Sequence, residues 1–277
     1  RLGDLLPHIV LIAGVVIVAF PIYMAIVAST HDNAVIANGQ MPLTPGPHAL
    51  ENYWHTIIAG TGKTTREPVG GMMVNSLIMA LVITIGKIAI SIISAFAVVF
   101  FVFPCRMAAF WIIFVTLMLP VEVRIYPTYK IASDLNMLDS YAGLTLPLIA
   151  SATATLLFRQ FFMTVPKELV EASKIDGAGP LRFFKDTLLP LSLTNIAALF
   201  VILFIYGWNQ YLWPLLITTR DDMQTIVIGI KKIIDVHDAL TEWQIAMATA
   251  VLAMLPPVAV VVLMQRLFVK GLIETEK

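Results

Sequence analysis

Long apolar stretches separated by polar loops dominate the pattern of the chain. Six of them run for about twenty residues or more with few charges, and they cover 7–29, 72–101, 107–129, 141–162, 194–217 and 243–265. A helix needs about 20 apolar residues to cross a bilayer, because its backbone N–H and C=O groups must all be paired inside the lipid. The pattern therefore predicts an all-α membrane protein, a single domain over residues 1–277 with six transmembrane helices.

The third stretch is the least regular of these predicted spans. Only its first part, 107–121, is free of charge, and Glu122 and Arg124 follow directly. Pro120 and Pro127 also remove backbone N–H groups that a helix uses. We therefore expect the outer half of this span to be broken or to line a polar cavity.

The polar loops differ in their basic residues. If both termini lie on one side, together with the loops after the second and fourth spans, that side carries ten lysines and arginines and the other carries seven. Because short cytoplasmic loops are enriched in lysine and arginine, this count predicts cytoplasmic termini. The first loop, 30–71, is then a long outer, periplasmic loop, and its glycines and prolines predict little regular structure.

Composition narrows the classes of function. The chain is 58% hydrophobic and 13% charged, whereas soluble domains carry about 25% charged residues. Basic and acidic residues balance at 18 each, so nothing favours nucleic acid as a partner. Cys105 is the only cysteine and the five histidines are scattered, which excludes an intrachain disulfide and predicts no metal site. We find no nucleophile–base pair and expect no catalytic residue.

The loop between the fourth and fifth predicted spans, 164–192, is the most informative local sequence. Pro166 suits the first turn of a helix, and Gly177 suits the left-handed residue that ends one. Pro180 begins a second helix, which Pro190 is expected to end. The sequence thus predicts a short helix–turn–helix on the cytoplasmic side, with small side chains that allow another protein to approach closely.

This loop resembles the EAA motif of ABC importer permeases, which reads Glu-Ala-Ala, two residues, Asp-Gly-Ala, then Phe and a terminal Pro. The matching residues are Glu171, Ala172, Ser173, Asp176, Gly177, Ala178, Phe184 and Pro190. Ser173 replaces the second alanine of the pattern and keeps the side chain small. In that family the loop is a coupling helix that seats in a groove of the ATPase, so the resemblance assigns these residues to ATPase coupling.

The resemblance extends beyond the loop. The stretches 118–127, 138–144, 158–162, 207–214 and 264–271 look like those of the maltose-permease-like carbohydrate uptake group. Within that group the chain is most similar to permeases for sn-glycerol-3-phosphate. The resemblance implies the type I ABC importer permease fold and the import of sn-glycerol-3-phosphate or glycerophosphodiesters.

The same resemblance implies an assembly. A second, different permease would pair with this chain in the bacterial inner membrane, two copies of a cytoplasmic ATPase would bind below, and a periplasmic binding protein would deliver the substrate. ATP and Mg²⁺ would bind to the ATPase, so this chain is expected to bind no cofactor and to hydrolyse nothing itself. Its remaining partner is the lipid bilayer.

Charged and polar residues within the spans are candidates for the translocation path. Lys87 lies near the middle of the second span, where an ammonium group costs about 2.5–3.5 kcal/mol to insert. It should face the interior of the helix bundle, either to attract a phosphate-bearing substrate or to pair with a carboxylate such as Glu122. Glu122 and Arg124 could also ring the path, contact the binding protein or form an interfacial ion pair. Asn209, beside three aromatic residues, is a further candidate.

Other functions stay open at this point. A permease of the same group for maltose or another oligosaccharide would carry the same motif. A secondary transporter driven by an ion gradient would show internal repeats with paired broken helices, which we do not find, and a membrane enzyme would need a metal cluster or a nucleophile–base pair. The segment 60–65 is similar to a phosphate-binding loop, but Ile57 stands where the first glycine belongs, which favours a flexible polar loop.

Overall fold

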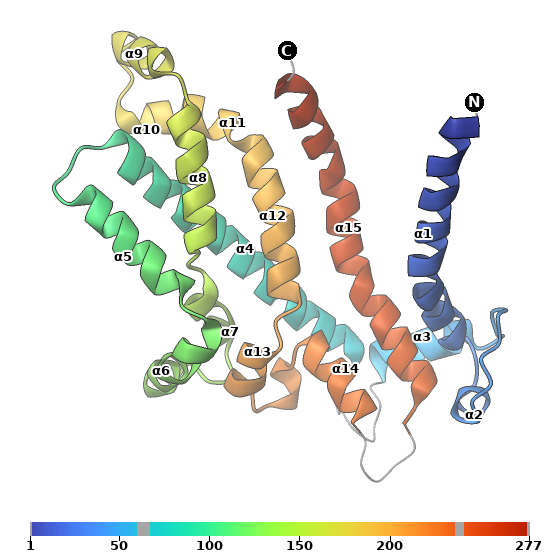
Figure 1. Cartoon of the computed structure of the whole chain (residues 1–277). Coiled ribbons are helices and arrows are strands. Elements are labelled where there is room, and N and C mark those ends of the chain that lie inside the picture. The colour runs from blue at the N-terminus through green and yellow to red at the C-terminus, as the bar shows by residue number, and fades with distance from the viewer. Residues whose placement is uncertain (1, 60–66, 236–240, 276–277) are drawn as a thin grey trace. The chain divides into compact units, whose positions relative to one another are not determined.

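The computed structural model describes residues 2–59, 67–235 and 241–275, and every regular element in these ranges is helical (Figure 1). Within them, the side chains of residues 2–5, 117, 121, 122 and 266–275 are not described. The segment 60–65, with its likeness to a phosphate-binding loop, lies outside the described residues.

The chain divides into two compact units. Unit 1 comprises residues 1–76 and 219–256, and unit 2 comprises 77–218 and 257–277. The long helices α4 (Val69–Phe100) and α15 (Trp243–Thr275) have residues in both units. The other elements of unit 1 are α1 (Leu2–Ala28), α2 (Asn33–Ala37), α3 (Ala49–Ile58), the 3₁₀-turn η3 (Asp221–Met223) and α14 (Ile226–Ile234).

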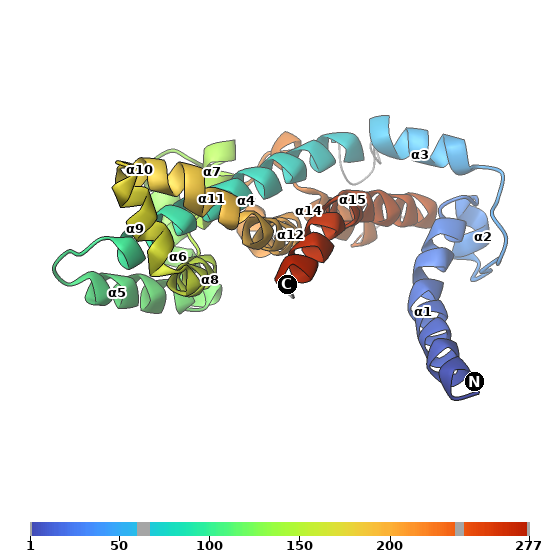
Figure 2. The same ribbon diagram turned by 90° about the horizontal axis from the view of Figure 1, so that it is seen from above.

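Unit 2 holds the shorter helices between α4 and η3. They are α5 (Arg106–Met118), α6 (Val121–Asp134), α7 (Tyr141–Thr145), the 3₁₀-turn η1 (Leu146–Leu148), α8 (Ala152–Thr164), α9 (Lys167–Ile175), α10 (Pro180–Phe183), the π-helical turn η2 (Phe184–Leu188), α11 (Leu189–Leu191), α12 (Leu193–Trp208) and α13 (Leu212–Ile217). Helices α5 and α8 pack side by side in this unit, as both views show (Figure 1, Figure 2).

Three described segments are long and apolar enough to cross a membrane in one piece. They are Leu6–Ala28, Val69–Phe100 and Trp243–Gln265, and up to five spans result if each of two bent helix pairs counts as one. The chain therefore has an all-α membrane architecture. The predicted boundaries of six spans remain predictions, because the other spans are interrupted.

The predicted third span is divided in the structure. Helix α5 ends at Met118, and Leu119 and Pro120 are extended, with ψ of 135° and 142°, before α6 begins. A residue that precedes proline avoids the helical region for steric reasons, which explains the break at this point. Pro127, by contrast, lies inside α6 without ending it. The 107–129 stretch is therefore two helices.

The predicted fifth span, 194–217, is likewise not one helix. Helix α12 ends at Trp208, and α13 starts at Leu212. Pro214 has no N–H to donate to a carbonyl four residues back, so a continuous helix would lose a bond here. The indole N–H of Trp213, which is only 2% exposed, donates to the backbone oxygen of Gly143 at 3.1 Å and holds α13 against α7.

Bends also divide two other helix pairs of unit 2. Segments Tyr141–Leu148 and Ala152–Thr164 meet at 47°, and segments Pro180–Leu191 and Leu193–Trp208 meet at 70°. At the second bend the hydroxyl of Ser192 donates to the carbonyl oxygen of Leu188 at 2.6 Å, which gives that carbonyl a local partner.

The first loop contains more regular structure than its composition predicts. Residues 30–71 include α2 and α3, where Asn52 donates its amide to the carbonyl oxygens of Ser29 and His31, both at 2.9 Å. The hydroxyls of Ser29 and Tyr53 also lie 2.9 Å apart. These contacts tie α3 to the end of α1. The expectation of little regular structure was wrong because Pro42, Pro45 and Pro47 lie between the two helices and Pro68 follows the second, so both helices stay intact.

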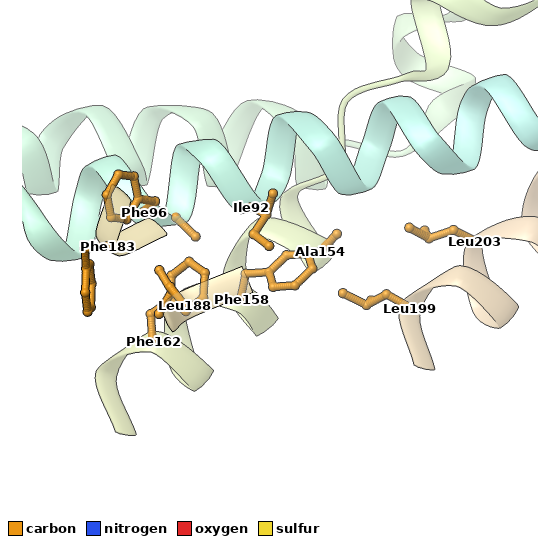
Figure 3. Packing of buried hydrophobic residues seen from close by; sticks show 10 residues of the cluster. Ile92, Phe96, Ala154, Phe158, Phe162, Phe183, Leu188, Leu199 and Leu203 are labelled. Atoms are coloured by element: carbon orange, nitrogen blue, oxygen red, sulfur yellow. The ribbon is translucent and has the colours of Figure 1, made fainter. Parts of the chain in front are cut away.

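The core of unit 2 connects the spans to the 164–192 loop (Figure 3). Its buried residues are Ile92, Ala95, Phe96, Ala154, Phe158, Phe162, Phe183, Leu188, Leu199 and Leu203. They come from α4, α8, α12 and the segment 180–191. Aromatic pairs such as those in this cluster contribute about 0.5–1.5 kcal/mol each beyond their area burial. Packing therefore holds the loop to the spans, in addition to the chain connections.

Candidate functional site

The 164–192 loop begins with the amphipathic helix α9, and its C-terminal cap defines the loop's tip. The N–H of Ala178 donates to the carbonyl oxygen of Ser173 at 2.9 Å, and that of Gly177 to the oxygen of Lys174 at 3.0 Å. Gly177 has φ of +70°, the left-handed conformation that glycine adopts without steric cost. The local sequence therefore ends α9 and turns the chain back toward the spans.

The segment that returns from the tip is helical from Pro180 to Leu191 and contains a π-turn at Phe184–Leu188. The expectation that Pro190 ends this helix was wrong by one residue, because the segment continues to Leu191 and bends at Ser192. A π-turn pairs each N–H with a more distant carbonyl and changes the helix register. The register therefore changes just before Pro190, which has no N–H to donate.

The motif residues divide by exposure. Those exposed are Glu171, Ala172, Asp176, Gly177 and Pro190, whereas Ser173, Ala178 and Phe184 are partly buried. The exposed residues lie on α9, at its cap and at the end of the return segment. A partner protein can therefore reach the acidic and small residues of the loop directly, while the partly buried ones face the chain itself.

Phe184 and its neighbour Phe183 connect the loop to α4. The ring of Phe184 lies 4.9 Å from that of Phe96, centroid to centroid, and the ring of Phe183 lies 5.4 Å from that of Phe100. Phe96 also contacts Phe101 edge-to-face at 5.3 Å. Phe183, Phe96 and Phe100 are functional candidates that sequence reasoning missed. Their only local signal is a run of aromatic residues near the end of a span.

Two apolar side chains flank the tip of the loop. Ile175, the last residue of α9, is 86% exposed, and Leu181 in α10 is 80% exposed. On the return segment, Arg182 and Asp186 form an exposed ion pair at 3.4 Å. Large apolar side chains exposed on a projecting turn are typical of surfaces that a protein partner covers. The sequence pattern alone did not single out Ile175 or Leu181.

A cavity of about 240 Å³ lies between the loop and the end of α4. It is lined by Phe96, Phe100, Phe101, Val102, Val170, Ser173, Lys174, Ala178, Pro180 and Phe183. Ser173 and Ala178 thus face the cavity as small side chains.

The candidates for the translocation path lie in the spans of unit 2. Lys87 is only 6% exposed, and its Nζ lies 3.8 Å from the centroid of the Tyr206 ring. The positive charge of Arg124 acts on the same ammonium group. The side chain of Glu122 lies outside the description, so the predicted ion pair with Lys87 stays a prediction. Asn209 is exposed at the end of α12.

Metal-ligating residues do not gather in the part of the chain that the structure describes. No group of three or more histidine, cysteine, aspartate or glutamate side chains is close enough there to hold an ion. Cys105 is exposed and unpaired at the start of α5.

Known proteins match the chain over most of its length. The family described as "Binding-protein-dependent transport system inner membrane component" matches residues 72–274. A protein of Rhizobium meliloti (strain 1021) named sn-glycerol-3-phosphate transport system permease protein UgpE is 59% identical, with 100% of this chain and 98% of that protein covered. A protein of the same name from Yersinia pestis bv. Antiqua (strain Antiqua) is 57% identical, with 99% and 97% covered.

The fold also matches a solved structure. It is the crystal structure of a bacterial ABC transporter involved in the import of the acidic polysaccharide alginate, with a TM-score of 0.78 and 96% of each chain covered. Sequence identity is 17%, so this likeness bears on the fold.

Proposed function

This chain belongs to the family of binding-protein-dependent transport system inner membrane components, and we propose that it carries sn-glycerol-3-phosphate or glycerophosphodiesters. It is a non-catalytic, multi-pass permease subunit of an ATP-driven ABC importer in the inner membrane, and the ATPase is a separate subunit. The observation that carries the proposed substrate is the 59% identity, over the whole chain, to permeases named for sn-glycerol-3-phosphate.

The assembly follows from this class of protein. Importers of this family combine a permease with a partner permease, an ATPase and a substrate-binding protein. In our proposal the partner permease is a different chain, two copies of the ATPase bind on the cytoplasmic side, and the binding protein is periplasmic. ATP and Mg²⁺ bind to the ATPase copies and not to this chain.

We propose that α9 and the tip of the loop dock on the ATPase. The exposed Ile175 and Leu181 would be buried there, with Glu171 and Asp176 at the polar edge. Movement of the ATPase would then pass through Phe183 and Phe184 to the rings of Phe96 and Phe100 on α4. Aromatic contacts and the packed core of unit 2 support this route, since close-packed side chains transmit displacement.

Uptake by the reconstituted importer tests the substrate. The complex of this chain with its partner permease, its ATPase and its binding protein is placed in vesicles and supplied with labelled sn-glycerol-3-phosphate, glycerophosphocholine or maltose. We expect ATP-dependent uptake of the two phosphate-bearing compounds and not of maltose. Uptake of maltose alone would contradict the proposal and favour a sugar permease of the same group. ATP hydrolysis by this chain alone would contradict the assignment of hydrolysis to a separate ATPase subunit.

We also propose that both termini face the cytoplasm, a placement supported by the excess of lysine and arginine on that side. Cys105, the only cysteine of the chain, is exposed and lies in the loop after the second predicted span. A membrane-impermeant maleimide should therefore label Cys105 in inverted vesicles and not in spheroplasts. Labelling only in spheroplasts would reverse the orientation.

A further inference from the structure

A buried ammonium group lies within the longest apolar span of the described chain. Lys87 belongs to α4, whose segment Val69–Phe100 qualifies as a membrane span, and Lys87 is 6% exposed. Its Nζ lies 3.8 Å from the centre of the Tyr206 ring on α12. Among the residues with described side chains, no carboxylate forms an ion pair with Lys87. The described contact of the Lys87 Nζ is thus the face of an aromatic ring.

A second cation acts on the same place. Arg124, on α6 after the break at Pro120, exerts its positive charge on Lys87, and it is partly buried. A cation–π contact stabilises an ammonium but leaves its net charge in place, whereas a carboxylate would cancel that charge. No described carboxylate forms an ion pair with either cation, and positive charge in a region of low dielectric attracts an anion strongly.

We propose that Lys87 and Arg124 form a transient binding site for the phosphate group of the transported substrate, with Tyr206 as the resting partner of the Lys87 ammonium. The proposal rests on the proposed function in one respect, namely that the substrate carries a phosphate group. Tyr206 is itself exposed on the surface of this chain, so its ring can move aside as an anion reaches the ammonium.

The chemistry of the two side chains suits this task. An ammonium is a compact point charge with three donors, and a guanidinium offers paired N–H groups that match two phosphate oxygens. Together they would bind the charged, non-bridging oxygens that a phosphate monoester and a phosphodiester share. When the anion leaves, Lys87 regains the ring of Tyr206, so the empty site does not need a permanent counter-ion that would compete with the substrate.

Phosphate binding to the assembled importer is the first test. The probe is inorganic phosphate, followed by ³¹P line broadening, with the complex in phospholipid-free detergent and in nanodiscs. We expect broadening in both preparations, and a loss of roughly ten- to a hundredfold in affinity for Lys87→Met. Lys87→Arg should retain binding. The matched control is Lys130→Met, which removes an exposed lysine paired with Asp134 and should leave the broadening unchanged.

Three outcomes overturn the proposal at this stage. Equal broadening in wild type and Lys87→Met would place the anion elsewhere. Absence of broadening in the wild type would show that the site binds no phosphate. Broadening in detergent that disappears in nanodiscs would assign the site to a lipid headgroup and not to the substrate.

Transport stoichiometry is the second test. In vesicles, the number of substrate molecules imported per ATP hydrolysed should fall about tenfold in Lys87→Met, as expected when a charge-assisted contact is lost. The rival explanation is a structural ion pair between Lys87 and Glu122. If Glu122→Gln restores the ratio in the Lys87→Met background, that pair is responsible and the anion site is wrong. If wild type takes up no sn-glycerol-3-phosphate yet shows Lys87-dependent phosphate binding, the proposed substrate fails while the anion site stands.

Discussion

The tip of the 164–192 loop and the middle of α4 present opposite problems of solvation. At the tip, Ile175 and Leu181 expose apolar surface where a partner can cover it. In α4, Lys87 buries an ionisable group within an apolar span. The first arrangement gains free energy from burial of area and suits a lasting contact between proteins. The second gains from electrostatics and suits an anion that must also leave.

This difference separates coupling from transport. A change at the tip should affect how the ATPase binds or drives the permease, whereas a change at Lys87 should affect what each ATP moves. The aromatic residues of α4 lie between the two, because Phe96 contacts the loop through Phe184 and shares its helix with Lys87. Substitutions in the three places should therefore give three different phenotypes.

The largest effect is expected at Gly177. A Cβ at this position would meet no atom of this chain within 4 Å, but its φ of +70° disfavours most side chains by about 1–2 kcal/mol. Gly177→Trp should abolish ATPase-coupled uptake through both the strained cap and the bulk at the docking surface. Coupled ATPase activity and uptake of the purified complex are the measurements, with membrane insertion retained.

Gly177→Asn is the matched control for that change. Asparagine tolerates the left-handed conformation better than other residues with a Cβ, so this variant should keep part of the coupling. If Gly177→Trp retains coupled ATPase activity, the loop does not contact the ATPase at its tip. The assignment of coupling to the tip, as distinct from transport at Lys87, would then be wrong.

Phe96→Ala comes next. Phe96 is buried against Phe100, Phe101 and Phe184, and loss of its ring should cost about 3–5 kcal/mol through the cavity that remains. We expect ATP hydrolysis that no longer responds to the binding protein, because the loop would move without displacing α4. Phe96→Leu keeps most of the volume and should be milder in both stability and coupling. Equal effects of the two variants on coupling would contradict a route through the aromatic rings.

The double variant Ile175→Ser, Leu181→Ser should act on assembly. Both side chains are exposed in this chain, so its own stability should be unchanged, while affinity for the ATPase should fall roughly ten- to a hundredfold per buried side chain. This affinity is measured by co-purification of the ATPase with the tagged permease over a series of salt concentrations. Leu135→Ser, an exposed apolar residue at the end of α6, is the control and should not change recovery.

The loop was predictable because its signals are local. The cap at Gly177 and the helix start at Pro180 each depend on neighbouring residues, and the structure has both features where the sequence places them. The exposure of Ile175 depends on which face of α9 turns toward the core, where Val170 packs, and no local pattern determines that. The π-turn before Pro190 escaped prediction for the same reason, since it adjusts the register of one segment to the core beneath it.

The interior of the spans was less predictable because its contacts join distant parts of the chain. The sequence required a partner for Lys87 in the bundle but could not identify Tyr206, which lies on a different span. The break at Trp208–Leu212 was missed because the uncharged run continues through it. Trp213 reaches the backbone of Gly143 there, and that long-range bond outweighs the helical pattern.

Gly179→Ala should give the smallest effect and separates the two glycines of the tip. Gly179 has φ of −73° and ψ of 169°, values open to any residue, and a Cβ there meets nothing within 4 Å. Alanine should therefore leave the permease as stable as before, or stabilise it by about 0.4–1 kcal/mol through the unfolded chain. Thermal unfolding and coupled uptake of the complex check this. A loss of coupling with unchanged stability would mean that the ATPase approaches the backbone at Gly179 too closely for a methyl group. The docking surface would then include the turn between α9 and α10, as well as the side chains that flank it.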